Sequence, residues 1–533
     1  MHAIFIQYIY ILLIILGLVM LANKLRLAYP IILVLGGLAL SFTGAFSDIT
    51  ISPELVFFIF LPPILYEAAW QTSWKEFWKW RRVITGFAFP IVILTSCVIA
   101  LVSNALIPGF TLALGFLLGG IISPPDAVAA TTVMRGLKVP KSLVSIIEGE
   151  SLLNDASSLV IFRFALAAII TGQFQLQDAA ADFLLVIAMG TVIGLAVGFI
   201  FYGIHRLLPT TPSIDIVLTL LTPYCMYYAA EHFHFSGVLA VVSGGLLLSH
   251  KRQRMLTYQS RIQGTNVWTN LIFVFNGLIF LLIGLQLPSI TEQIGIGLGT
   301  AIAYGLIISV ILIITRLLCT LGTSYFTRFM SRFITVADAN PGWRMPLIAG
   351  WAGMRGVVSL AAALSIPLLI NEGQPFPFRN LILFITFIVI LVTLVLQGLT
   401  LPLVIRKLNP EDRYTAIPEN QQELIIQKKL ALASLEALEQ YGNEHANNQH
   451  FNNLVARLQI DSNFFQQTLS EATQTKDNAL TTFQRIYLNL LERQRELLYE
   501  MNNRAEFDED IIRKYLSLID IEEFKVREKI LQR

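Results

Sequence analysis

The sequence predicts an all-α, polytopic membrane protein with a polar tail. Of its 533 residues, 55 % are hydrophobic and only 14 % are charged, and the mean hydropathy is +0.65. A soluble globular chain carries about 25 % charged residues, so an ordinary cytosolic enzyme is excluded. Residues 1–410 carry a net charge of +8 and residues 411–533 a net charge of −6. This contrast divides the chain into an apolar part and a polar part.

Thirteen apolar runs in residues 1–410 are candidates for membrane spans, which need about 20 apolar residues each to cross the bilayer core. They cover residues 3–23, 29–46, 52–70, 83–106, 109–137, 145–171, 180–204, 214–231, 236–250, 268–288, 293–325, 346–369 and 379–405. Several runs are short, as is usual for buried or re-entrant helices. The fifth and the twelfth runs are interrupted.

The positive charges between these runs fix an expected orientation. If the N-terminus lies outside, the odd-numbered connections hold 19 Lys and Arg residues, and the even-numbered connections hold only Arg379. Positive charge in short loops marks the cytoplasmic side. We therefore expect about thirteen spans, an external N-terminus and a cytoplasmic tail. Because Lys24 and Arg26 follow the first run, that run is expected to be a retained span and not a cleaved signal peptide.

The two interrupted runs predict broken helices. In the fifth run, Pro124 and Pro125 cannot continue a helix, and Asp126 follows them directly. In the twelfth run, three glycines loosen the helix around Arg355. They are Gly350, Gly353 and Gly356.

Broken helices at corresponding places in two halves point to the site of a secondary transporter. The fifth and twelfth runs are seven spans apart, so they cross the membrane in opposite directions. An inverted repeat of spans 1–6 and 8–13, joined by span 7, would produce this arrangement. The alternative is that both breaks reflect only the frequency of Pro and Gly in membrane helices.

The sixth run carries a polar cluster near the expected membrane centre. Asn154 and Asp155 lie about ten residues into it, and Ser151 precedes Asp155 by one turn on the same helix face. Glu150 lies one turn before Asn154, closer to the cytoplasm. Carboxylate, amide and hydroxyl oxygens suit a hard cation. Burial also favours the neutral form of a carboxylate, so Asp155 could hold a proton.

Other interpretations of these residues remain open. Ionisable side chains within spans are costly, and Asp155 could simply form an ion pair with Arg163 or Arg355. Glu67, near the cytoplasmic end of the third run, could belong to the site or lie at the interface. Arg163 and Arg316 could each serve as a structural counter-charge.

Five segments of residues 1–410 occur in an order that resembles the monovalent cation/proton antiporter family, in the bacterial type of its electroneutral sodium/proton exchanger branch. The segments are FLPPILYEAAW, SPPDAVAA, EGESLLNDASSLVIF, AEHFHFSGVLAVVSGG and WAGMRGVVSLA. The resemblance implies that Asp155 alternately binds cation and proton, that Ser151 supplies a hydroxyl ligand, and that Asn154 belongs to the family's Asn-Asp pair.

The resemblance also implies roles for supporting residues. Glu67 would orient Asn154, and Glu150 and Arg355 would form an ion bridge between spans 6 and 12. A homodimer is implied, with a dimerisation half and a mobile core half that holds two crossing helices.

At the helix crossing the sequence departs from the Thr-Asp-Pro motif of the family. Pro125 replaces the Thr and Ala127 replaces the Pro on either side of Asp126. A threonine side chain is therefore missing, but the backbone carbonyl of Pro125 and the carboxylate of Asp126 could still contribute to a cation site.

These features predict an antiporter that exchanges Na⁺, Li⁺ or K⁺ for H⁺ in the plasma (inner) membrane and so serves sodium transport and pH homeostasis. The resemblance implies a bacterial source. One carboxylate that binds either ion, and crosses only when neutralised, makes exchange obligatory and electroneutral. No GxxxxGK[ST] motif occurs, so no nucleotide or other cofactor is expected. The expected partners are monovalent cations, protons, the bilayer and a second copy of the chain, without nucleic acid.

Two other function classes compete with antiport. A cation channel requires a pore lined by rings of carbonyl or carboxylate groups, and the sequence has no filter-like repeat. An intramembrane enzyme could use Asp126, Asp155 and Glu67 as acid–base groups or metal ligands. No Ser-His pair or His-Glu metal spacing accompanies them.

Residues 411–533 are expected to form a soluble, helix-rich tail, because apolar residues recur there at three- and four-residue spacing. The simpler interpretation is a small helical domain that packs on itself or on a dimer partner. A regulatory sensor is the alternative.

Overall fold

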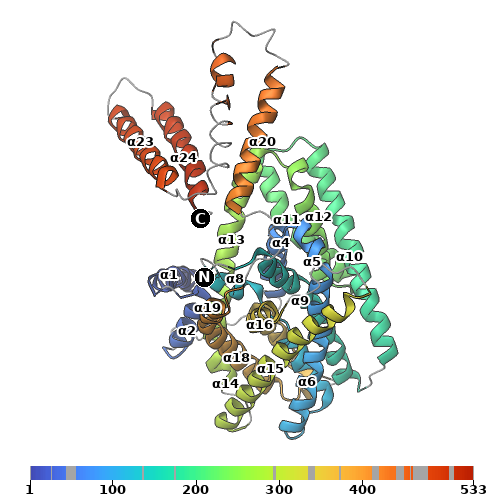
Figure 1. Cartoon of the computed structure of the whole chain (residues 1–533). Coiled ribbons are helices and arrows are strands. Elements are labelled where there is room, and N and C mark those ends of the chain that lie inside the picture. Colours follow the sequence, from blue (N-terminus) through green and yellow to red (C-terminus); the bar gives the residue numbers. More distant parts are fainter. Residues whose placement is uncertain are drawn as a thin grey trace. The chain divides into compact units, whose positions relative to one another are not determined.

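The structure is a computed structural model of the whole chain (Figure 1). It describes residues 2–25, 27–43, 56–134, 137, 139–172, 176–291, 294, 296–333, 342–370, 374–410, 419–439, 449, 451–456, 458–459, 462, 478–502 and 509–531. Two compact units divide the chain, Met1–Asp412 and Arg413–Arg533. Residues 44–55, which include the end of the second run and the start of the third, lie outside the described part, as do Arg26, Arg135 and Lys138 of the loop charges.

The first unit is built from helices, and a helix occupies each of the thirteen apolar runs where the structure describes them. In the N-terminal half these are α1 (His2–Leu25), α2 (Tyr29–Ser41), the π-helical turn η1 (Val56–Phe60) with α4 (Leu61–Gln71), α5 (Trp74–Gly86), η2 (Phe87–Ile91), α6 (Val92–Leu106), α7 (Leu112–Ile122), α8 (Ala127–Met134) and α9 (Lys141–Thr171). The helix α10 (Leu176–Leu207) follows.

The C-terminal half is also built mainly from helices. It contains α11 (Pro212–His232), α12 (Gly237–Met255), α13 (Tyr258–Leu285), α14 (Leu287–Thr291), α15 (Leu298–Met330), α16 (Arg344–Trp351), α17 (Val357–Leu364), α18 (Arg379–Val392), η3 (Thr393–Gln397) and α19 (Gly398–Leu408). Two short strands, β1 (Leu369–Ile370) and β2 (Gln374–Pro375), pair as an antiparallel hairpin. The expectation of an all-helical membrane fold is therefore confirmed, with this hairpin as a small addition.

Seven helical segments among the described residues are long and apolar enough to cross a bilayer. They are Trp74–Leu106, Leu112–Met134, Lys141–Thr171, Phe183–Leu207, Tyr258–Leu285, Leu298–Phe329 and Arg379–Leu408. The first of them begins nine residues before the apolar run at 83–106, because the helix continues through a segment rich in Trp and basic residues. Such residues are typical of the membrane–water interface, where hydropathy alone ends a span too early.

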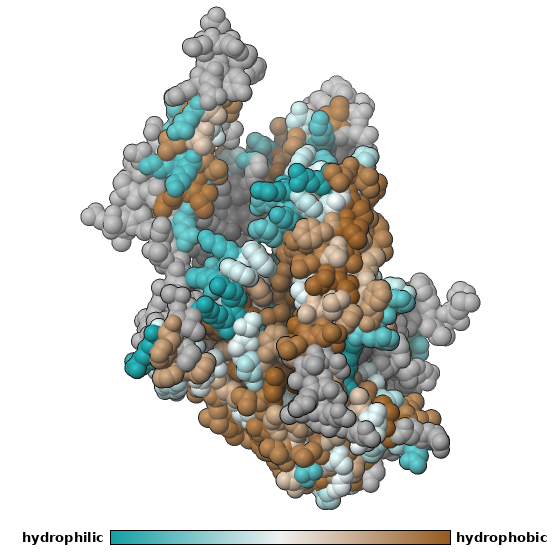
Figure 2. Space-filling model, turned by 90° about the vertical axis from the view of Figure 1, so that its right-hand side faces the viewer, coloured by the Kyte–Doolittle hydropathy of each residue, from teal (hydrophilic) through white to brown (hydrophobic). Residues whose placement is uncertain are grey.

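Apolar side chains cover much of the visible coloured surface of the first unit (Figure 2). Part of this surface comes from α10, whose exposed side chains include Leu184, Leu185, Met189, Val192, Phe199 and Ile200. A soluble protein rarely exposes so large an apolar face. The bilayer is the solvent that such a face requires.

The helix α7 packs tightly between α6 and α9, and glycines make this approach possible. A Cβ atom on Gly119 would lie 2.7 Å from the backbone oxygen of Ser96, and one on Gly120 would lie 3.0 Å from the backbone nitrogen of Phe162. Small residues allow membrane helices to approach at backbone distance. This packing places the end of α7 beside the middle of α9, and α8, α9 and α16 lie together within the first unit (Figure 1).

The second unit contains the helices α20 (Glu419–Glu439), α23 (Asn478–Asn502) and α24 (Glu509–Leu531). The last two pack against each other, and Arg495 on α23 forms ion pairs with Asp520 and Glu523 on α24. The helical content expected for the tail is present in these described segments.

Candidate functional site

Two broken helices meet inside the first unit. The helix α7 ends at Ile122 and α8 begins at Ala127, whereas α16 ends at Trp351 and α17 begins at Val357. The backbone N–H of Asp126 donates to the carbonyl of Met354 over 2.7 Å, which joins the two breaks. A Cβ atom on Gly356 would overlap the Asp126 carboxylate, so only glycine allows this approach.

Arg355 is fully buried and holds the end of α7. Its Nε donates to the carbonyl of Ile122 at 2.9 Å, and its Nη2 donates to the carbonyl of Ser123 at 3.2 Å. A third bond joins its Nη1 to the carbonyl of Gly353. The last carbonyls of a helix have no donors within the helix, and a cation stabilises the negative end of the helix dipole. Arg355 therefore closes the break that the two prolines create.

The expected ion bridge between Glu150 and Arg355 is wrong. Glu150 on α9 instead accepts two hydrogen bonds from Arg316 on α15, from Nη1 at 2.8 Å and from Nη2 at 2.9 Å. Both side chains are buried. The sequence shows three arginines within spans, Arg163, Arg316 and Arg355, but it does not show which of them pairs with Glu150, because pairing between spans depends on how the helices pack.

Asp155 lies on α9 and is only 6 % exposed. Its carboxylate has no hydrogen-bond or ion-pair partner among the described residues. Arg163 instead pairs with Glu231, with Nη2 at 2.7 and 2.8 Å from the two carboxylate oxygens, and Arg355 binds backbone carbonyls. The alternative in which Asp155 serves a structural ion pair with either arginine therefore has no support in this part of the chain.

The start of α8 contacts α9 near Asp155. The Ser151 hydroxyl accepts a hydrogen bond from the backbone N–H of Ala127 at 3.2 Å. The Asp126 carboxylate accepts one from the N–H of Val128 at 2.8 Å. These two groups satisfy free donors at the positive end of a helix, as capping residues do.

The side chain of Asn154 bonds to the break between α7 and α8 and does not bond to Glu67. Its Nδ2 donates to the carbonyl of Pro125 at 3.1 Å, whereas Glu67 accepts a bond from Gln71 at 3.0 Å. The expectation that Glu67 orients Asn154 is therefore not met by the described contacts. A carbonyl oxygen has two lone pairs, so the Pro125 oxygen retains one acceptor position.

One cavity of about 470 Å³ brings most of the expected residues together. Its lining includes Asp155, Ser151, Pro125, Asp126 and Glu67. The other expected residues, Asn154, Glu150 and Arg355, do not line this cavity, although Asn154 donates a hydrogen bond to the lining residue Pro125. Carboxylates that share a buried cavity repel each other, and a bound cation or proton lowers that repulsion.

Glu148 also lines this cavity, and the sequence reasoning missed it. It precedes Asp155 by seven residues, which is two helical turns, and so lies on the same face of α9. Glu150, which the sequence predicted for the site, pairs with Arg316 instead. The spacing to Asp155 was the signal that distinguishes the two glutamates.

A family model described as "Sodium/hydrogen exchanger, transmembrane" matches residues 10–407. The chain belongs to the sodium/hydrogen exchanger family. This membership confirms the expected class of function, sodium/proton antiport by a membrane transporter, and the enzyme alternative is dismissed.

Similar proteins agree with this membership of the exchanger family. A sodium, potassium, lithium and rubidium/H⁺ antiporter of Bacillus pumilus is 34 % identical over 409 residues, which cover 74 % of this chain and 60 % of that protein. An uncharacterized Na⁺/H⁺ exchanger of Mycobacterium bovis is 30 % identical over 522 residues, which cover 95 % of this chain and 93 % of that protein.

The fold of the exchanger also resembles a solved structure. The sodium proton antiporter MjNhaP1 of Methanocaldococcus jannaschii matches 76 % of this chain and 97 % of its own, with a TM-score of 0.58 and 20 % sequence identity. At this identity the likeness supports the fold alone.

Proposed function

We propose that this exchanger carries Na⁺, Li⁺ or K⁺ in one direction and H⁺ in the other, with Asp155 as the shared binding group. The observation that carries the proposal is the Asp155 carboxylate, which is buried, lacks a partner among the described residues and lines a cavity with other oxygen donors. A buried carboxylate in this state requires a proton or a cation.

The remaining ligands are the Ser151 hydroxyl, the Pro125 carbonyl and the Asp126 carboxylate. Oxygen donors of this kind suit hard cations. Asn154 supports the set, since its bond to Pro125 fixes the carbonyl beside Asp155. Glu67 and Glu148 line the same cavity and attract cations into it.

Exchange is electroneutral if only one of the two aspartates changes its charge. Asp126 accepts a backbone N–H at the start of α8, where the helix dipole stabilises a negative charge. We therefore assign Asp126 a constant charge and Asp155 the alternating one. One cation and one proton then compete for a single site, and the empty, charged site does not cross, so each ion moves only against the other.

The proposed architecture has thirteen spans, an external N-terminus and an inverted repeat of spans 1–6 and 8–13. The break between α7 and α8 and the break between α16 and α17 support it, because they fall in the fifth and the twelfth span. We further propose a homodimer in a bacterial plasma membrane, alternating access by the half that holds the broken helices, and a cytoplasmic tail of residues 411–533 that regulates transport or supports the dimer.

Reconstituted vesicles with an imposed pH gradient test the proposal. Added sodium, lithium or potassium should trigger proton movement that persists when the membrane voltage is clamped. Asp155→Asn should abolish it, whereas Glu76→Gln, which makes the same change on α5 away from the cavity, should not. Exchange that survives in Asp155→Asn would overturn the role of Asp155, and cation flux without proton movement would indicate a channel.

A further inference from the structure

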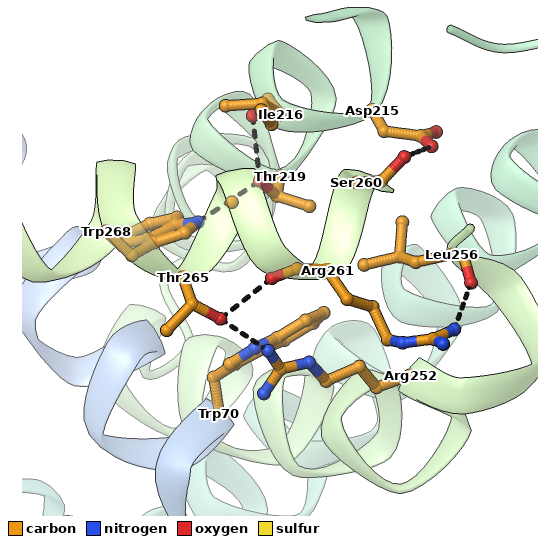
Figure 3. Close-up of a pocket in the computed structure, with 11 residues that line it drawn as sticks. Trp70, Asp215, Ile216, Thr219, Arg252, Leu256, Ser260, Arg261, Thr265 and Trp268 are labelled. Atoms are coloured by element: carbon orange, nitrogen blue, oxygen red, sulfur yellow. Dashed lines mark hydrogen bonds between the residues drawn. The ribbon is translucent and has the colours of Figure 1, made fainter. Parts of the chain in front are cut away.

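A second, small pocket lies where the ends of α11, α12 and α13 meet α4. Its enclosed space is about 10 Å³, and the rest of it is open to solvent. Figure 3 shows its lining. Its residues include Arg252 from the end of α12, Arg261 and Thr265 from the start of α13, and Trp70 from α4. None of these belongs to the cavity around Asp155.

The two arginines bring positive charge that no described carboxylate neutralises. Arg252 donates from Nη2 to the hydroxyl of Thr265 at 2.7 Å, and Arg261 donates from Nη1 to the carbonyl of Leu256 at 2.6 Å. Neither forms an ion pair within the described part of the chain. The Nε of Arg252 is buried and lacks a hydrogen-bond partner there. Partly buried cations without a counter-ion are costly, so the pocket suits an anion.

Asp215 is the acidic residue of the lining, and its two oxygens are already engaged. Its Oδ1 lies 2.8 Å from Nδ1 of His205, and its Oδ2 accepts a bond from the Ser260 hydroxyl at 2.7 Å. Figure 3 shows Asp215 and Ser260 at the opposite end of the pocket from Arg252. Asp215 therefore belongs to a buried polar network and does not neutralise the arginines.

Aromatic walls complete the pocket. The Arg252 guanidinium lies 5.4 Å from the ring centroid of Trp70, a cation–π distance. Trp268 forms another part of the wall and donates from Nε1 to Thr219 at 3.1 Å. Tryptophan rings are typical of the headgroup level of a membrane. The planar guanidinium matches the geometry of phosphate oxygens.

We propose that Arg252 and Arg261 bind a phosphate group at the solvent-open side of this pocket, supplied by the headgroup of an anionic phospholipid or by free inorganic phosphate. Basic pockets between membrane helices on the cytoplasmic side recognise such headgroups, and the proposed orientation places these helix ends on that side. The binding itself is independent of the proposed transport reaction.

The test is a thermal-unfolding titration of the full-length protein in detergent. Phosphatidylglycerol and sodium phosphate are the two probes, with phosphatidylcholine and sodium chloride of equal ionic strength as their controls. Arg252→Gln and Arg261→Gln remove the pocket charges. Arg254→Gln is the matched control, because Arg254 is exposed on the same helix end and outside the pocket. The concentration for half-maximal stabilisation should rise about tenfold in the pocket variants and stay unchanged in the control.

The two probes distinguish the sources of the phosphate. Stabilisation by phosphatidylglycerol alone assigns a lipid headgroup, and stabilisation by both probes assigns the phosphate group itself. No stabilisation of the unmodified protein by either probe, or equal half-maximal concentrations in all three variants, would overturn the proposal. If Arg252→Gln does not fold, Arg252→Lys serves instead and should weaken binding by a smaller factor, because it keeps the charge but loses the planar fork. No ion gradient is involved, so a failure of exchange would leave this result unaffected.

Discussion

Removing the charge of Glu150 should strongly destabilise the first unit, because Arg316 would stay buried without its partner. The two side chains are 1 % and 3 % exposed and make two contacts of 2.8 and 2.9 Å. Breaking a buried ion pair by removing one partner costs about 3–5 kcal/mol. Glu150→Gln should therefore lower the free energy of unfolding by that amount, whereas the double variant Glu150→Gln/Arg316→Gln should lose less than the sum of the single changes.

Reversible unfolding by SDS in mixed micelles measures these free energies, and a double-mutant cycle isolates the coupling. For residues in contact, the coupling amounts to about 0.5–3 kcal/mol. The control cycle combines Glu150→Gln with Arg355→Gln, since Arg355 binds carbonyl groups and not Glu150. A coupling of Glu150 to Arg355 that equals or exceeds its coupling to Arg316 would refute the reasoning.

Three further changes follow from the same contacts. Gly356→Ala places a Cβ atom on the Asp126 carboxylate and should slow exchange at least about tenfold. Gly322→Ala is the control, because its Cβ atom meets open space, and it should not slow exchange. Equal exchange rates of the two variants in vesicle assays would contradict this expectation. Arg163→Gln removes an exposed ion pair and should change the free energy of unfolding by less than about 1 kcal/mol; a larger loss on SDS titration would show that the pair is more than a surface contact. Glu148→Gln should raise the apparent KM for sodium at 0.1 M salt but hardly at 1 M salt, because the Debye length falls from about 10 Å to about 3 Å. A rise in KM that is the same at both salt concentrations would show that Glu148 does not act by electrostatic attraction of sodium.

The helices and two central site residues, Ser151 and Asp155, could be predicted from the sequence because the relevant signals are local. Hydropathy marks the apolar runs, and Pro124 and Pro125 end α7 within one residue of the observed break. The four-residue spacing of Ser151 and Asp155 places both on one face of α9, and both line the same cavity.

The pairings between helices could not be predicted, because they depend on packing in three dimensions. Arg316 pairs with Glu150 across 166 positions of sequence, and nothing in either neighbourhood indicates the other. The buried network of His205, Asp215 and Ser260 likewise joins three helices. Each of these residues is unremarkable in its own segment.

The central claim is that one carboxylate, Asp155, is shared by the cation and the proton. Its most direct test is the initial rate of sodium uptake into vesicles, measured against sodium concentration at several values of pH on the same side of the membrane. Shared binding predicts that the apparent KM for sodium rises with the proton concentration, while the rate at saturating sodium stays constant. An apparent KM that does not change with pH would contradict a shared site.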